Sequence, residues 1–154
     1  MTAVSLDSFL ETGRARLAKG PVAIILIEDD SAVQQALAHH LRVGFNLVLA
    51  PLPAHAVPAD PKGRILNLIH DCRQPSAHVQ AVNAVIAAAP VGTWLYYGYN
   101  AEFLFYPFME NRSICEMLTF HAEERRDAML TYVIDLYAPD LARYPDAVSL
   151  DQAM

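Results

Sequence analysis

The class of fold follows from the run Pro21-Val-Ala-Ile-Ile-Leu-Ile-Glu28-Asp29-Asp30. Its apolar part, residues 22–27, has the length of a strand and lies between a proline and three acids. A short apolar run without a polar face is typical of a strand buried on both sides of a parallel sheet. The run therefore predicts a central strand of an α/β fold.

Helices and strands are expected to alternate around this strand. Apolar residues at helical spacing predict an N-terminal helix within residues 1–20, from Ser5 to Ala18. Two more helices are predicted, one from Ser31, which has capping-box spacing to Gln34, and one capped by Ser76. The other strands are predicted over residues 45–50, 64–69 and 93–97. This order predicts a three-layer α/β fold with a mainly parallel sheet and helices on both faces.

The rest of the chain gives weaker signals. Residues 51–63 hold four prolines and a glycine, which predicts a loop. Residues 115–126 look helical, and residues 128–137 are rich in strand formers, with a helix as the alternative. With 154 residues the chain can bury one ordinary core. We therefore expect a single domain over 1–154, with its core at 21–107 and a continuation at 108–154.

Charge and composition narrow the partners and the location. The net charge of −6 and the lack of a Lys/Arg run argue against nucleic acid or an anionic membrane as a partner. The longest apolar run is too short for a transmembrane segment, and no signal-peptide pattern is present. Because nothing marks the chain as secreted, Cys72 and Cys115 are expected to be reduced thiols. These features predict a cytoplasmic location.

Polar residues follow the first and last of the core strands. Glu28 and Asp29 come directly after the first strand, and Asn100 and Glu102 come after the strand at 93–97. Ligands of open α/β sheets bind beyond the carboxyl ends of the strands. We therefore expect these four side chains to face one crevice. The alternative is an ordinary strand-end turn whose glutamate is merely solvated.

Two other groups of reactive side chains have simpler interpretations. His39 and His40 are adjacent on the predicted helix, so they point in different directions and do not form a metal pair. We expect His40 at the edge of the core and His39 in solvent. Cys72 follows a strand end, where a thiolate nucleophile could lie beside His70. No residue pattern assigns it a base, so a buried, reduced thiol is the favoured interpretation.

Two stretches resemble family-2-like glycosyltransferases of the GT-A fold. In the first, the strand at 22–27 with its acids precedes a helix that ends in a His-x-x-x-Gly pattern, His40 to Gly44. In the second, a helix with the sequence Val-Gln-Ala-Val-Asn at 79–83 precedes Trp94-Leu-Tyr-Tyr and Asn100-Ala-Glu-Phe-Leu104. This order is similar to the branch with a Trp and an Asp-x-Asp-Glu-Phe-Leu motif. The resemblance covers approximately residues 21–104.

The resemblance implies an enzyme that transfers a sugar from a nucleotide diphosphate donor to a hydroxyl of a sugar or lipid-linked acceptor. It implies a Rossmann-like half that binds the nucleotide sugar, with Glu28, Asp29, Asn100 and Glu102 at the donor. It also implies a divalent metal, Mg²⁺ or Mn²⁺, held by Glu102 and Asn100. Such a metal neutralises the negative charge that develops on the departing nucleoside diphosphate.

The chain departs from this pattern at several positions. When the motif is aligned on Glu102-Phe103-Leu104, Tyr99 and Ala101 stand where its two aspartates belong, which leaves Glu102 as its carboxylate. A shift by one residue instead gives Asn100-x-Glu102. No pattern after Asp135 indicates a general base, so no catalytic residue is assigned, and a short or truncated member of the family is expected. The alternative function is a non-catalytic α/β module that kept the glycosyltransferase scaffold and lost the metal motif.

Overall fold

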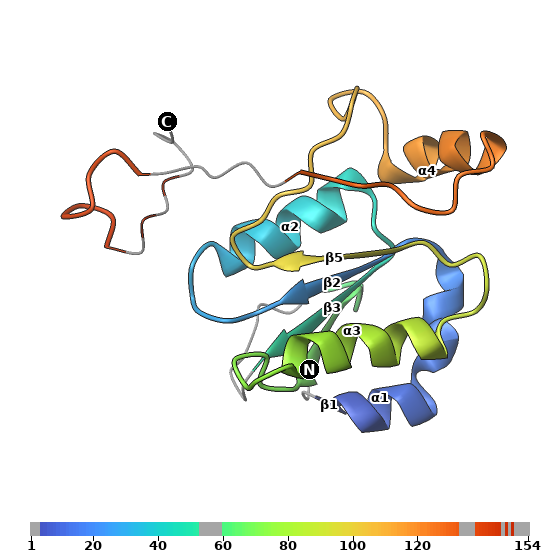
Figure 1. Cartoon of the computed structure of the whole chain (residues 1–154), viewed down its shortest axis with the longest axis horizontal. Coiled ribbons are helices and arrows are strands. Elements are labelled where there is room, and N and C mark those ends of the chain that lie inside the picture. Colours follow the sequence, from blue (N-terminus) through green and yellow to red (C-terminus); the bar gives the residue numbers. More distant parts are fainter. Residues whose placement is uncertain (1–3, 53–59, 133–137, 146, 148, 150–154) are drawn as a thin grey trace.

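The computed structural model describes residues 4–52, 60–132, 138–145, 147 and 149. Within these ranges the chain forms one five-stranded sheet in which every strand pair is parallel, with helices on both faces (Figure 1). The predicted α/β class is therefore confirmed. The strands are β1 (Val4–Ser5), β2 (Val22–Leu26), β3 (Leu47–Leu52), β4 (Ile65–Ile69) and β5 (Leu95–Tyr99). The helices are α1 (Leu6–Thr12), the 3₁₀ helix η1 (Arg14–Lys19), α2 (Val33–Val43), α3 (Ala77–Ala88) and α4 (Ile114–Glu123).

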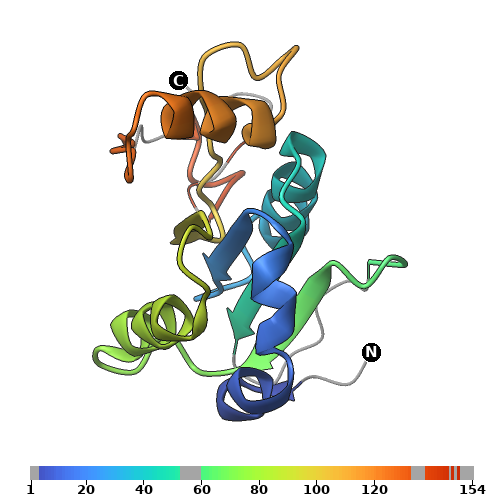
Figure 2. The same ribbon diagram turned by 90° about the vertical axis from the view of Figure 1, so that its right-hand side faces the viewer.

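The strand order places a change of direction beside β2. The order across the sheet is β1-β4-β3-β2-β5, so the chain moves from β2 outward to β4 and then returns to the opposite side of β2. Right-handed crossovers in opposite directions place their helices on opposite faces of a sheet. Figures 1 and 2 show this arrangement, with α2 on one face and α1 and α3 on the other. The topological switch point, where the strand order changes direction, therefore lies between β2 and β5.

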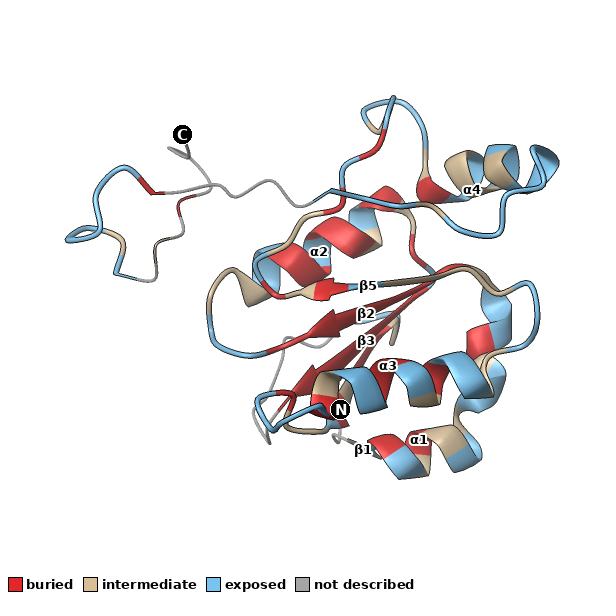
Figure 3. Cartoon of the chain, in the orientation of Figure 1, coloured by how far each residue is buried: buried red, intermediate tan, exposed pale blue. Residues whose placement is uncertain are grey.

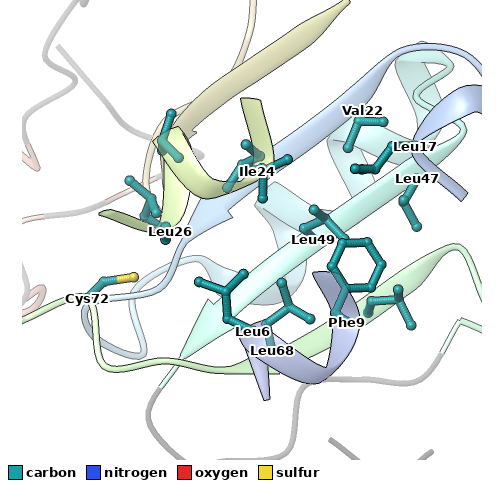
Figure 4. Close-up of a cluster of buried hydrophobic side chains, with 14 residues drawn as sticks. Leu6, Phe9, Leu17, Val22, Ile24, Leu26, Leu47, Leu49, Leu68 and Cys72 are labelled. Atoms are coloured by element: carbon teal, nitrogen blue, oxygen red, sulfur yellow. The ribbon is translucent and has the colours of Figure 1, made fainter. Parts of the chain in front are cut away.

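Two apolar clusters, one on each face, hold the sheet between its helices. Alternate residues of β2 point to opposite faces: Ile24 and Leu26 pack toward α1, η1 and α3, whereas Ala23 and Ile25 pack toward α2. We call these the α3-side cluster, which includes Ile24 and Leu26, and the α2-side cluster, which includes Ala23 and Ile25. Figure 4 shows the α3-side cluster, which reaches Cys72 at the carboxyl end of the strands. Figure 3 shows β2 and β3 buried along their length and α4 largely exposed. Burial on both faces explains why β2 has no polar face.

The predicted N-terminal helix is wrong in two respects. Val4 and Ser5 form β1, which pairs with β4, and the α-helix ends at Thr12 instead of continuing to Ala18. A Cβ atom at Gly13 would lie 2.5 Å from the Phe9 ring, so the residue after the helix must be a glycine. The chain continues as η1, which buries Leu17 completely before β2 begins.

The predicted helix caps are also wrong in their chemistry. α2 begins at Val33 after Ala32, whose φ is 50°, and no side chain caps it. The Ser31 amide donates to the Asp29 carboxylate, so Ser31 is part of a turn and not of a capping box. Ser76 does occupy the N-cap of α3, but with φ 62° its hydroxyl makes no capping bond. A complete capping box occurs at the start of α4, between Ser113 and Glu116.

The second core strand lies two residues later than predicted. β3 covers Leu47–Leu52 instead of 45–50, and Phe45 is buried in the α2-side cluster before the strand begins. Pro51 belongs to the strand because its carbonyl accepts a bond from the Ile27 amide, at 3.0 Å. Residues 128–132 form neither helix nor strand, and residues 133–137 lie outside the described ranges. None of the described helices is both long enough and apolar enough to cross a bilayer.

Candidate functional site at the carboxyl edge of β2 and β5

The candidate site lies at the switch point, where β2 and β5 end side by side. Leu26 and Tyr99 are partners in the register of the two strands, and the chain leaves them through residues 27–32 and 100–104. Ligands of open α/β sheets usually bind beyond the carboxyl ends of the strands at such a point. Here both segments lead toward the α2 face, because the segment after β5 packs on α2 through Leu104. The four residues predicted from the sequence all lie in these two segments.

Asn100 joins the two segments. Its Oδ1 accepts a hydrogen bond from the Glu28 amide at 3.0 Å. Its Nδ2 donates to Asp29 Oδ1 and to the Ser31 carbonyl, both at 2.7 Å. The side chain is only 3% exposed, so these bonds satisfy a buried amide. The structure therefore brings Glu28, Asp29 and Asn100 together, and Asn100 acts as a buried clamp on the loop after β2.

Asp29 is the acidic partner of this clamp. Its Oδ1 also accepts a bond from the Ser31 amide at 2.8 Å. Burial alone would raise the pKa of Asp29, but the hydrogen bonds from Ser31 and Asn100 outweigh it and lower the pKa below its ordinary value. The carboxylate is therefore charged at neutral pH. Glu28 and Asp30 on either side of it are exposed.

Glu102 closes the turn after β5. Its Oε2 accepts a bond from the Tyr99 amide at 2.9 Å, and its own amide donates to the Tyr99 carbonyl at 3.0 Å. The carboxylate folds back over Gly98, where an added Cβ would lie 3.0 Å from Oε2 and 2.6 Å from the Tyr96 hydroxyl oxygen. Burial and the nearby Glu102 charge raise the pKa of Tyr96 to about 12. Glu102 thus supports its own turn.

Side chains on the α3 face of the sheet also lie at its carboxyl edge. The rings of His78, at the start of α3, and Tyr99 are tilted at 52° with their centroids 6.4 Å apart. Burial and the neighbouring charges, chiefly that of Glu28, raise the pKa of Tyr99. Burial, together with the charges of Asp71 and Glu28, raises the pKa of Cys72 to about 11. Cys72 is therefore a buried thiol at neutral pH and not an activated nucleophile.

Both adjacent histidines of α2 are buried, so the prediction of a solvated His39 is wrong. His39 is 4% exposed, and its Nε2 donates to the Leu104 carbonyl at 2.9 Å, which ties α2 to the segment after β5. His40 is fully buried, donates from Nδ1 to the Ala36 carbonyl at 2.7 Å and stacks on Tyr96. Burial lowers the pKa of His40 to about 4. Both rings are structural groups of the α2 face.

The donor atoms at this edge do not form a preformed metal site. Within the described ranges, no group of three or more His, Cys, Asp or Glu side chains is placed to hold a metal ion. One carboxylate oxygen of Asp29 and one of Glu102 already accept N–H bonds, and both polar atoms of Asn100 are engaged. Asn100 and one oxygen of Glu102 are therefore engaged with the protein's own groups, and the Mg²⁺ or Mn²⁺ site expected at these two residues stays a prediction.

Two hollows lie away from this edge. One, of about 380 Å³, is at the amino ends of β2 and β5 and is lined by Pro21, Trp94 and residues of α4. The other, of about 440 Å³, lies between Arg42 and residues 109–113. Both volumes lie within the 300–1,000 Å³ typical of ligand pockets. Neither includes a residue of the Asn100 clamp.

Sequence reasoning did not identify Tyr99 and His78 as neighbours. Tyr99 looked like one more apolar residue of a strand, and His78 was an isolated residue of a helix. No signal in the sequence indicated this pair, because it depends on the strand order, which brings the start of α3 and the end of β5 to one edge. In comparisons with known proteins, the chain matches no family model, no curated protein and no solved structure.

Proposed function

We propose that this protein binds a nucleotide diphosphate sugar at the carboxyl edge of β2 and β5 and acts as a glycosyltransferase. The observation that carries the proposal is the Asn100 clamp, which fixes the loop after β2 against the end of β5 at the switch point. A loop held by a buried residue 71 positions away is ordered before a ligand arrives. Preorganisation of this kind reduces the entropy cost of binding.

The chemistry of the edge suits the nucleoside part of such a donor. Glu28 and Asp30 are exposed carboxylates on either side of the clamped Asp29, and carboxylates accept hydrogen bonds from ribose hydroxyls. α2 begins at Val33, immediately after this loop, and the positive end of a helix favours a phosphate nearby. These features support a ribose and a diphosphate at the edge. They assign no general base and no acceptor.

The proposal needs no preformed metal site. The residues that would hold Mg²⁺ or Mn²⁺ are Asn100 and Glu102, and both are already engaged with the protein's own groups. We therefore expect donor binding to persist in EDTA. A metal that did bind would supply positive charge for the leaving diphosphate.

A non-catalytic α/β module is the second candidate, and a specific observation favours it. Asn100 and Glu102, at the position of the family's metal motif, are used to stabilise backbone turns. A module of this kind would bind a nucleoside diphosphate without cleaving its sugar bond. Binding and turnover must therefore be measured separately.

The test of binding is titration calorimetry of the whole chain with uridine or guanosine diphosphate at millimolar concentration, once in EDTA and once in Mn²⁺. Glu28→Gln is expected to weaken binding, whereas the matched variant Glu123→Gln, on exposed α4, is expected to leave it unchanged. The absence of binding with either nucleotide and in either buffer would overturn the proposal. Release of free sugar or its transfer from a bound donor would separate the enzyme from the module.

A further inference from the structure

Tyr99 and His78 form an aromatic pair at the candidate site. Tyr99 is the last residue of β5, next to the Asn100 clamp, and His78 is the second residue of α3. Both are half-buried, so each ring keeps a part of its surface in solvent. The pair joins two elements that reach the carboxyl edge of the sheet from different parts of the chain.

The two rings of the pair meet at an angle and are not stacked. The two rings are tilted at 52° with centroids 6.4 Å apart, so they do not lie flat on each other. Among the described residues, Tyr99 has no other aromatic neighbour in the range of ring contacts. Tyr99 packs on the α3-side cluster, which includes Cys72 at the carboxyl end of the strands. The exposed part of its ring is therefore available to a planar group bound at the edge.

We propose that Tyr99, supported by His78, is the platform on which the nucleobase of the donor stacks. This inference rests on the proposed function and assigns its base-binding residue. Stacking is tolerant of base identity because every base has a π-face. We therefore expect uridine and guanosine diphosphates to bind with similar affinity.

The experiment compares three variants of the whole chain by titration calorimetry with uridine diphosphate and with inorganic pyrophosphate. Tyr99→Leu removes the ring, Tyr99→Phe keeps it, and Tyr97→Leu removes a ring from the same face of β5, two residues farther from the edge. Tyr97 is 62% exposed and is therefore a matched control. Base stacking is worth about 1–3 kcal/mol, so Tyr99→Leu should weaken uridine diphosphate binding about 5- to 150-fold.

The result that supports the inference is a loss specific to Tyr99→Leu and to the nucleotide, with pyrophosphate affinity unchanged and Tyr99→Phe close to the wild type. Circular dichroism confirms that each variant is folded before it is titrated. Equal uridine diphosphate affinity in all three variants would overturn the inference and leave the donor site in place. A loss as large in Tyr97→Leu as in Tyr99→Leu would also overturn it. A wild-type chain that binds no nucleotide would instead overturn the proposed function.

Discussion

The β2–α2 and β4–α3 units have the same plan but are stabilised in different ways. In the first, Asn100, the buried residue directly after β5, clamps the loop, and the helix buries His39 and His40. In the second, the exposed Asp71–Arg73 pair orders the loop locally. The buried residues of α3 are all apolar: Ala77, Ala81, Val82 and Val85.

This difference indicates which part of the carboxyl edge is ordered before a ligand binds. Long-range bonds to a buried amide constrain the loop after β2. In the loop after β4, the His70 amide and the buried Cys72 thiol bond to carbonyls of β3, whereas the exposed Arg73 and Gln74 bond only locally, to Asp71. Local, exposed contacts compete with water and contribute little stability. We therefore expect the β2–α2 loop to keep one conformation when a ligand binds. The exposed part of the β4–α3 loop is expected to adjust to the ligand.

The largest expected effect is the acid sensitivity of the α2 unit. His40 has a pKa of about 4 in the folded state against 6.5 ordinarily, so the unfolded chain binds its proton first as the pH falls. Neutral His40 therefore contributes its full share to the free energy of unfolding above pH 6.5. This share, about 3 kcal/mol, is lost as the pH falls from 6.5 to about 4. Urea unfolding at several pH values checks this. His40→Phe should remove most of this dependence and the matched His78→Phe should not; the same acid sensitivity in both would contradict the assignment.

The next effect tests the clamp. Asn100→Ala removes three side-chain hydrogen bonds and leaves the Glu28 amide and the Ser31 carbonyl without their partner. We expect a loss of about 2 kcal/mol in the free energy of unfolding, measured by denaturant titration. Hydrogen exchange should become faster at residues 28–31 and stay unchanged at 71–76. Equal effects on the two loops would show that the β2–α2 loop is not specially fixed.

A smaller and opposite effect is expected at the start of α2. Ala32 has φ 50°, a conformation that glycine adopts without strain. Ala32→Gly should stabilise the protein by roughly 0.5–1 kcal/mol, because relief of the strain exceeds the extra entropy of the unfolded chain. Thermal unfolding measures the change. The control is Ala38→Gly, in the exposed middle of the same helix, which should cost about 1 kcal/mol; destabilisation by Ala32→Gly would disprove the strain.

The smallest effect is expected in the β4–α3 loop. The hydrogen bond from Arg73 lowers the pKa of Asp71 below its usual range, so the pair is intact near neutral pH and is lost only in acid. Because both side chains are solvated, Asp71→Asn should leave the melting temperature at pH 7 within experimental error. A loss comparable to that of Asn100→Ala would show that the two loops are held equally strongly.

The sequence alone determined the class of fold and which two strand ends lie side by side. The apolar run at 22–27 indicated a strand buried on both faces, and the structure confirms it with every residue of β2 fully buried. The acids after that strand were predicted to lie beside the Asn100 segment, and hydrogen bonds from Asn100 to the Glu28 amide and the Asp29 carboxylate confirm this, whereas Glu102 bonds its own turn and a shared crevice stays a prediction. These predictions succeeded because burial periodicity and the location of strand ends are local properties of a sequence.

Only the tertiary structure decided what the polar side chains do. Ser31 had the right spacing for a cap, but the Asp29 carboxylate binds its amide and the chain turns at Ala32 instead. His39 was expected in solvent, but the segment after β5 covers it and accepts its hydrogen bond through the Leu104 carbonyl. Tyr99 and His78 meet because the strand order reverses beside β2. Each of these outcomes depends on a partner, a turn or a strand order that the spacing of neighbouring residues does not encode.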